Sequence, residues 1–427
     1  MIEMDEAGLK FSFPEVAERV RKMAEEEIGR RIPRWMAEDH GVVLQRWRST
    51  GSVKRPEVAE WCDEAERRLA QATEKDFRHA ALSAVEIPPC EMRVGFQRTL
   101  RIPDDGRDYP LPPGLGRFPL RHVDDFAASV PAAWLERGGV MMPMHQSEAL
   151  WLEFGARYPF ALKIATGKVN AISGENWSAG LHRQPQDYVV LPDQPWLDGY
   201  CVARGAIRQF VAMPLGDGYG AEEQITGRAE FGGIQLQAHP LSSKIFFEES
   251  IRRELPDSLK DLLRHLVGRP IPFVTYHCGG TGTFPEAMPC CESAPDMSLG
   301  AGGRMRQEIY EDRRGAGAWD THVSSRCFVH LCNSRAWRKI TGTKPPSPPF
   351  SAAEYTRHGL PWFDYYDDSK VAVGGAEPLK DLKSIAEMGE GKGEIPLPEN
   401  ESVDPTLIVQ YGVRRRPEQV REWVEKE

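Results

Sequence analysis

The sequence predicts an α+β protein: an N-terminal helical segment on a β-rich core with an antiparallel or mixed sheet, followed by a mixed C-terminal region. Residues 14–79 are rich in Glu, Lys, Arg and Ala and carry apolar residues at helical spacing. Residues 92–102 change to an alternating apolar and polar pattern, which is typical of a half-buried strand. Short strand-like runs with few helices then follow, which favours an antiparallel or mixed sheet over βαβ units. We expect a helical segment at 1–87, a β-rich core at 88–245 and a mixed α/β region at 246–427.

Composition and charge argue against several classes of protein. The chain has 427 residues, of which 41% are hydrophobic and 27% charged, and these values are ordinary for a globular protein. A net charge of -9 gives no electrostatic basis for binding nucleic acid or an anionic membrane. The acidic start, MIEMDEAGLKFSF, lacks the basic and apolar parts of a signal peptide. No apolar run approaches the roughly 20 residues of a membrane span, so we expect a soluble, cytoplasmic protein.

Two helices are predicted in the N-terminal segment. Pro14 suits the first turn of a helix that runs to about Arg31. A second helix, from about Pro56 to His79, carries one apolar stripe, while its other faces are charged. The stripe consists of Val58, Trp61, Ala65, Leu69 and Ala72. Such a helical segment either packs on the main body or docks a partner protein.

Short strands are predicted through the middle of the chain. The stretch FALKIATGKVNAIS should form a hairpin that turns at Thr166-Gly167. The runs YVVL, IRQFVAMPL and GIQLQAHP follow, each bounded by Gly, Pro or Asp. Later in the chain, SSRCFVHLCNS also has the pattern of a strand.

The C-terminal region mixes helices and loops. DSLKDLLRHLVG carries a helical stripe of apolar residues, and SAAEYTRHG begins with the capping-box spacing of Ser351 and Glu354. Between these two helices, the Gly-, Cys- and Pro-rich residues 278–303 predict a long loop. RPEQVREWVEKE predicts a last helix with Pro417 in its first turn.

Six blocks of the sequence together resemble a family of uncharacterised bacterial and fungal proteins. In chain order they are PMHQSEALWLEF, KIATGKVNAISGENWS, PQDYVVLPDQPWLDGY, IRQFVAMPLGDGY, GGRMRQEIYED and YTRHGLPWFDYY. The resemblance covers about Val94 to Val403 and is weakest over residues 241–295. It implies no activity, ligand or cofactor, so the functional hypotheses depend on the residues themselves.

The three glycines of Gly216–Gly220 raise the question of a phosphate-binding loop. A dinucleotide fold needs a strand, the pattern G-x-G-x-x-G and a helix. Ile207–Leu215 is a plausible strand, but Ala221 replaces the third glycine. The pair Glu222-Glu223 would repel a pyrophosphate, and no Lys-Ser/Thr pair of a P-loop follows. We therefore interpret the glycines as a tight turn or a ligand-covering loop, because glycine adopts positive φ readily.

A zone of cysteines and histidines is the candidate metal site. Its members are His277, Cys278, Cys290, Cys291, Cys327, His330 and Cys332, and the first four are the weak zinc candidates. Their spacing matches no C-x-x-C pair. On the predicted strand, Cys327 lies on one face while His330 and Cys332 share the other. We favour free or structural thiols and expect no cofactor, with zinc as the alternative.

Two blocks combine aromatic rings with carboxylates, namely PDQPWLDG and PWFDYYDD. Such sets suit sugar binding, and a carboxylate pair could hydrolyse a glycoside. The alternative, which we favour, is that the rings pack at the edge of the core and the acids cap turns. A third block, RMRQEIYED, would place Glu308 and Asp312 on one face one turn after Arg304 if it is helical. That arrangement suits acid–base chemistry or, as we favour, an exposed ion-pair ladder.

A small anion or carboxylate site beside the glycine turn is a further hypothesis. It requires the hairpin at residues 160–170 to pair with the strand that carries Arg208. The residues that it would unite are Lys163, Lys168, His145, His182 and Arg208.

No motif fixes a reaction, since the chain contains neither G-x-S-x-G nor H-E-x-x-H. We expect a protein that binds a small ligand, with a sugar-like molecule as one candidate, in a cleft near residues 207–227, and whether it is an enzyme stays open. One alternative is a carboxylate-dependent hydrolase, possibly directed at glycans. Another is an interaction protein that docks through its N-terminal helices. The candidate ligand-binding residues are Arg208, Gly216, Gly218, Trp196, Asp198, Lys163 and His145.

Overall fold

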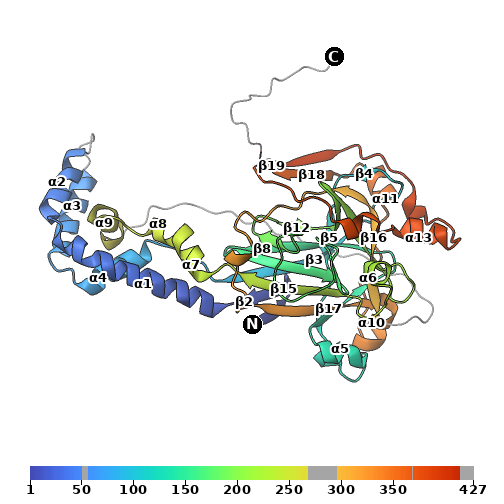
Figure 1. Cartoon of the computed structure of the whole chain (residues 1–427). Helices are drawn as coiled ribbons and strands as arrows, with labels where there is room; N and C mark the ends of the chain where they lie inside the picture. Colours follow the sequence, from blue (N-terminus) through green and yellow to red (C-terminus); the bar gives the residue numbers. More distant parts are fainter. Residues whose placement is uncertain (51–55, 268–295, 368, 414–427) are drawn as a thin grey trace, which may run out of the picture. The chain divides into compact units, whose positions relative to one another are not determined.

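The computed structural model describes residues 1–50, 56–267, 296–367 and 369–413 (Figure 1). Two compact units divide these residues. The sheet unit lies within Met1–Ser12, Glu91–Pro240 and Glu286–Glu427, and the helical unit lies within Phe13–Cys90 and Leu241–Pro285. Helix and strand each make up about 31% of the structure, and the strands form mixed sheets, which confirms the predicted α+β class.

In the described residues, the larger sheet of the sheet unit has ten strands. They are β1 (Ile2–Asp5), β2 (Gly8–Ser12), β3 (Glu91–Thr99), β4 (Asp108–Tyr109), β5 (Gly114–Arg117), β8 (Ala149–Ala156), β12 (Trp196–Leu197), β13 (Gly199–Ala203), β14 (Ala206–Pro214) and β16 (Met297–Arg306). Neighbours follow the order β1-β2-β3-β8-β14-β16-β4, and β5, β12 and β13 pair with β3, β8 and β14. β4 joins β16 in parallel. β3 and β14 confirm two predicted strands, whereas β1 and β2 replace helix expected at the N-terminus.

The smaller sheet has seven strands within the part of the chain that the structure describes. They are β6 (Arg121–His122), β7 (Val140–Met144), β9 (Phe160–Thr166), β10 (Val169–Asn170), β11 (Val189–Leu191), β15 (Ile234–Pro240) and β17 (Ser325–Asn333). The order is β10-β9-β15-β17-β7-β6, and β11 pairs with β9. Val169 pairs with Thr166, which confirms the predicted hairpin turn.

The two sheets contact each other through buried side chains. The Tyr200 hydroxyl, from β13 of the larger sheet, lies 2.7 Å from the Thr166 hydroxyl of β9 and donates to the Leu299 carbonyl of β16 at 2.8 Å. Every residue of β9 is buried, so both faces of this strand are covered. The side chain of Lys163 therefore lies inside the protein.

Shorter elements complete the sheet unit. They are α5 (Ala132–Arg137), α6 (Ala221–Thr226), α10 (Ser334–Thr341), α11 (Ala352–Arg357), α12 (Glu377–Lys380), α13 (Ile385–Gly391), the 3-10 turns η1 (Asp124–Phe126), η3 (Ala316–Ala318) and η4 (Pro398–Asn400), and the parallel pair β18 (Trp362–Asp367) and β19 (Ile408–Val413). The capping box at α11 is confirmed. Ser351 Oγ accepts from the Glu354 N–H at 3.2 Å, and the Glu354 carboxylate accepts from the Ser351 N–H at 3.0 Å.

The regular elements among the described residues of the helical unit are helices. They are α1 (Pro14–Ala37), α2 (His40–Thr50), α3 (Pro56–Leu69), α4 (Glu74–Ser83), α7 (Ser243–Phe246), the π-helical turn η2 (Phe247–Ile251), α8 (Arg252–Glu254) and α9 (Leu259–Val267). Pro14 begins α1 as predicted. The single helix expected from Pro56 to His79 is wrong: a capping box between Thr73 and Asp76 begins a separate helix, α4. No helix among the described residues is long and apolar enough to cross a membrane.

Residues 297–303, expected within a loop, belong to strand β16 (Met297–Arg306) instead. The three glycines of this strand are required because neighbouring segments leave no space for a Cβ atom, and not because the chain turns there. A Cβ on Gly300 would lie 2.7 Å from the Tyr219 carbonyl oxygen, and one on Gly303 would lie 2.1 Å from the Pro103 carbonyl oxygen. The predicted helix at residues 416–427 lies outside the described residues.

Candidate functional site

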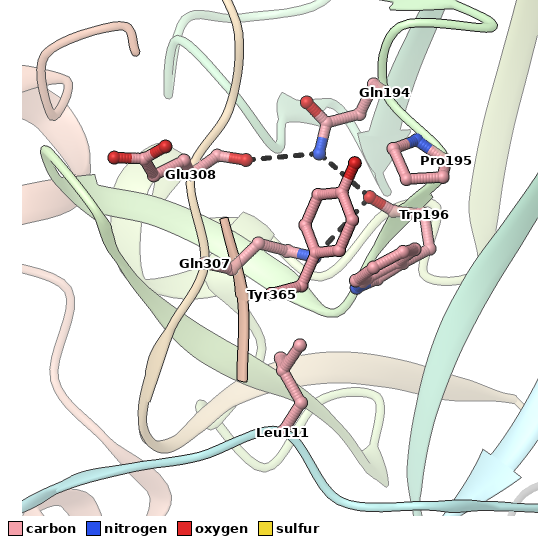
Figure 2. Close-up of a pocket in the computed structure, with 7 residues that line it drawn as sticks. All are labelled: Leu111, Gln194, Pro195, Trp196, Gln307, Glu308 and Tyr365. Carbon is pink, nitrogen blue, oxygen red and sulfur yellow. Dashed lines mark hydrogen bonds between the residues drawn. The ribbon is translucent and has the colours of Figure 1, made fainter. Parts of the chain in front are cut away.

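A small cavity with room for about one water molecule lies in the sheet unit where four segments that are distant in the sequence meet (Figure 2). The segments are the two aromatic–acid blocks, the RMRQEIYED block and the loop that contains Leu111. The lining residues are Leu111, Gln194, Pro195, Trp196, Gln307, Glu308 and Tyr365. The blocks singled out as separate candidates in the sequence therefore form one site.

Two buried glutamines hold the segments together. The Gln194 amide donates to the carbonyls of Trp196 and Glu308 at 3.0 and 3.2 Å, and its oxygen accepts from the Tyr310 N–H at 3.1 Å. Gln307 donates to Asp198 at 2.8 Å and accepts from the Asp198 N–H at 3.0 Å. Both amide side chains therefore form hydrogen bonds that strand pairing would otherwise provide between these segments. They thereby fix the wall of the cavity in place.

This bonding also explains why RMRQEIYED is not the helix considered above. Arg304 and Arg306 belong to β16, and the backbone beyond them is satisfied by side chains instead of by helical hydrogen bonds. Gln186 accepts from the Asp312 N–H at 2.8 Å and donates to the Tyr310 carbonyl at 3.0 Å. Glu308 and Asp312 consequently share no helix face.

Asp198 is the buried acid behind the cavity. Its side chain accepts hydrogen bonds from Gln307 and from the Trp196 indole, and burial raises its pKa to about 7. The bond to Asp198 fixes the ring of Trp196, which meets the ring of Tyr365 edge to face, with centroids 4.7 Å apart. Both rings are half-buried, so each presents surface to the cavity.

Charged side chains beside the cavity are paired with one another. Arg306 donates to both carboxylate oxygens of Asp364 at 3.2 and 3.1 Å. Lys370 lies 3.5 Å from an Asp193 carboxylate oxygen and 3.3 Å from an Asp367 oxygen. Both cations are therefore paired, and the three carboxylates exceed them by one negative charge.

The glycine turn at residues 216–220 directs three backbone N–H groups at one anion. That anion is a carboxylate of the same chain. The N–H groups of Gly216, Gly218 and Gly220 all donate to the Glu223 carboxylate, at 2.9, 2.8 and 2.9 Å. Gly216 and Gly218 have φ of +101° and +78°, which turns their N–H groups toward one centre. Neither glycine lines the cavity of Figure 2, and the N–H groups of the turn bind the carboxylate of Glu223.

We expect Glu223→Gln to destabilise the sheet unit by about 1–3 kcal/mol, because a neutral amide with one acceptor oxygen replaces a carboxylate that binds three N–H groups. Urea unfolding measures the change. Glu230→Gln, at an exposed neighbouring acid, is the control and should change stability by less than about 0.5 kcal/mol. Equal effects of the two substitutions would contradict this account of the turn.

The anion site that united Lys163 with Arg208 is not formed. Lys163 lies on β9 of the smaller sheet, where β9 pairs with β15, whereas Arg208 lies on β14 of the larger sheet. The reason is pairing between distant strands, which sequence periodicity does not specify. His145 is also engaged elsewhere, since its Nε2 lies 2.8 Å from the Pro346 carbonyl oxygen.

Lys163 is instead the cation of a buried polar cluster. Its ammonium lies 2.6 Å from Asp187 and donates to the carbonyls of Ser178 and Gly180 at 2.9 and 2.8 Å. The exposed ring of His182 lies 2.8 Å from the same Asp187 carboxylate. Three acceptors satisfy the three ammonium hydrogens, so Lys163 stabilises the fold here and has no donor left for a ligand.

The candidate zinc ligands His277, Cys278, Cys290 and Cys291 lie outside the described residues. Within the described ranges, no group of three or more metal-ligating side chains comes together. The strand β17 follows the predicted alternation. His330 stacks on Trp134 with centroids 4.7 Å apart, while burial raises the pKa of the Cys327 and Cys332 thiols to about 12. These three side chains act as packing residues.

Of the seven candidate binding residues, Trp196 lines the cavity and Asp198 lies directly behind it. Gln194 and Gln307 were not among the predicted site residues. A glutamine whose side chain forms hydrogen bonds with the backbone of a distant segment leaves no local pattern in the sequence. Comparisons with family models, curated proteins and solved structures find no match for this chain. The resemblance to a bacterial and fungal family therefore stays a prediction.

Proposed function

We propose that this chain binds a small, uncharged ligand with a flat face, such as a single sugar ring, at the cavity beside Trp196 and Tyr365. The observation that carries the proposal is the ring pair itself. Two half-buried rings, 4.7 Å apart, line a cavity, and one of them is held by a hydrogen bond to a buried carboxylate. Rings fixed before binding lose little conformational entropy when a ligand stacks on them.

The size and charge of the cavity define the class of ligand. The cavity itself has room for about one water molecule, so a ligand would stack on the solvent-facing parts of the two rings instead of being enclosed, which suits one ring or one end of a longer ligand. The neighbouring cations are paired with Asp364, Asp193 and Asp367. An anionic ligand would have to disrupt those pairs and would meet an excess of carboxylates, which favours a neutral ligand over an anion.

The hydrolase alternative has weaker support at this cavity. Glycoside hydrolysis uses two carboxyl groups on either side of the bond that is cleaved. Among the seven lining residues the one acid is Glu308, and Figure 2 shows its carboxylate directed away from the two rings. Asp198 is buried behind Trp196. We therefore propose binding rather than catalysis.

Replacing the ring at position 196 tests the proposal. Isothermal titration with a panel of neutral mono- and disaccharides should identify a ligand, and Trp196→Ala should weaken its binding by about tenfold or more, because truncating a buried aromatic contact removes over about 1.4 kcal/mol. Trp177→Ala is the matched control, a half-buried tryptophan that packs over Lys163 away from the cavity. Binding that survives Trp196→Ala, or binding of charged ligands alone, would contradict the proposal.

A further inference from the structure

Strands β18 and β19 carry aromatic side chains on one face. The two strands are parallel, and their register places Tyr411 of β19 beside Tyr365 of β18. Phe363 lies two residues before Tyr365, so its side chain shares the face with both tyrosines. A ring contact agrees with this placement, since the rings of Phe363 and Tyr411 stack with centroids 5.9 Å apart. Three rings from two strands therefore lie on one face.

This face continues to the cavity of Figure 2. Leu111, which lines the cavity, exchanges two backbone hydrogen bonds with Phe363, at 2.7 and 2.9 Å, so the two side chains are cross-strand neighbours on the same side. Tyr365 also lines the cavity, and its ring contacts the ring of Trp196 (Figure 2). One continuous surface therefore joins the cavity to β19. This aromatic platform consists of Trp196, Tyr365, Phe363 and Tyr411.

The aromatic platform is open to solvent at its far end. Its other three rings are half-buried, whereas Tyr411 is 56% exposed. A ligand can stack on such a surface without an enclosed space. The charge of Asp364, which alternates with the rings along β18, belongs to the opposite face and is paired with Arg306. The platform thus offers apolar ring faces together with the polar hydroxyl groups of two tyrosines.

We propose that the aromatic platform binds an extended, uncharged oligosaccharide, with its first sugar ring at Trp196 and the next rings along Phe363 and Tyr411. The inference rests on the proposed function and names its ligand as a chain of sugars. Neighbouring strands lie about 4.8 Å apart, so a surface that crosses β18 and β19 extends beyond the contact of one sugar ring. Oligosaccharides with equatorial linkages are flat ribbons with apolar ring faces and hydroxyl edges, which suit rings that carry polar tips. A second copy that paired with β19 would bind through backbone groups and would not require rings on one face.

Isothermal titration with cello-, N-acetylchito- and xylo-oligosaccharides, each from the single sugar to the tetramer, tests the proposal. In at least one series the affinity should increase by roughly fivefold or more from the single sugar to the trimer, because the added rings stack on further aromatic side chains. Tyr411→Ala should remove this increase and leave the affinity for the single sugar unchanged. The variant should fold, because Tyr411 is more than half exposed. Ile408→Ala is the matched control, since Ile408 is 40% exposed on the opposite face of the same strand, and the increase should persist in it.

The outcomes separate this inference from the proposed function. Suppose that a single sugar binds and that Trp196→Ala weakens its binding. An affinity that does not increase with chain length, or an increase that survives Tyr411→Ala, would then overturn the oligosaccharide proposal alone. No binding in any series would overturn both. Sedimentation velocity tests the other occupant, because a dimer of the sugar-free protein that dissociates in Tyr411→Ala would show that a second copy covers the aromatic platform, and the proposal would be wrong.

Discussion

Replacing Lys163 by Met should lower the free energy of unfolding by about 3–5 kcal/mol, because removing one partner of a buried ion pair leaves an uncompensated charge. The pair is well enclosed, with Lys163 and Asp187 side chains 1% and 5% exposed. The substitution would also remove the donors that hold the Ser178 and Gly180 carbonyls. Lys163 should therefore be a structural residue that has no direct part in binding.

Urea unfolding of three variants tests this role. Lys168→Met is the control, since Lys168 is half-exposed and lies 3.5 Å from Glu230; it should lose less than about 1 kcal/mol. The double variant Lys163→Met with Asp187→Asn should be more stable than Lys163→Met alone, because the orphaned charge is gone. Equal stability of the Lys163 and Lys168 variants would show that the buried pair is unimportant.

Asp198 should make stability fall as the pH rises from about 4 to 7. Its pKa is raised by burial from 3.8 to about 7, so the folded state binds one more proton than the unfolded state between these values. The favourable contribution is complete below the unfolded pKa and is lost as the pH rises through the folded pKa. The expected slope is about 1.4 kcal/mol per pH unit between pH 5 and 7.

Asp198→Asn isolates this contribution. The amide nitrogen cannot accept a hydrogen bond, so the variant should be less stable than the wild type by about 1 kcal/mol at low pH. The amide also cannot ionise, so the stability of the variant should gain on that of the wild type as the pH rises. His330, whose pKa is lowered by burial to about 4, titrates in both proteins and cancels in the difference. Denaturant unfolding between pH 5 and 8 measures it. A stability difference that does not change with pH would contradict a buried, proton-binding Asp198.

Local signals in the sequence predicted those elements that depend on neighbouring residues alone. The alternation after Glu91 predicted β3, Pro14 marked the beginning of α1, and Ser351 with Glu354 marked that of α11. Each of these features is encoded within a few residues, by side-chain period or by a capping contact. The fold class followed from the same information.

Features that depend on distant neighbours were not predictable. β16 contains Gly300, Gly302 and Gly303, which disfavour a strand locally but are required where other segments approach. The partner of β9 is set by tertiary packing, so the proximity of Lys163 and Arg208 could not be judged. The same limit applies to the cavity. Its aromatic residues were noticed, whereas the glutamines that join its segments became meaningful only once the fold was known.

The indole N–H signal of Trp196 gives the most direct test of ligand binding at the aromatic cavity. The protein contains 11 tryptophans, and labelling them with 15N resolves their indoles, with Trp196→Phe identifying the signal in question. A neutral sugar that binds should shift the Trp196 signal saturably and leave the Trp177 signal in place. If no neutral sugar shifts the Trp196 signal, or if the shifts gather at other tryptophans, the proposed function is wrong.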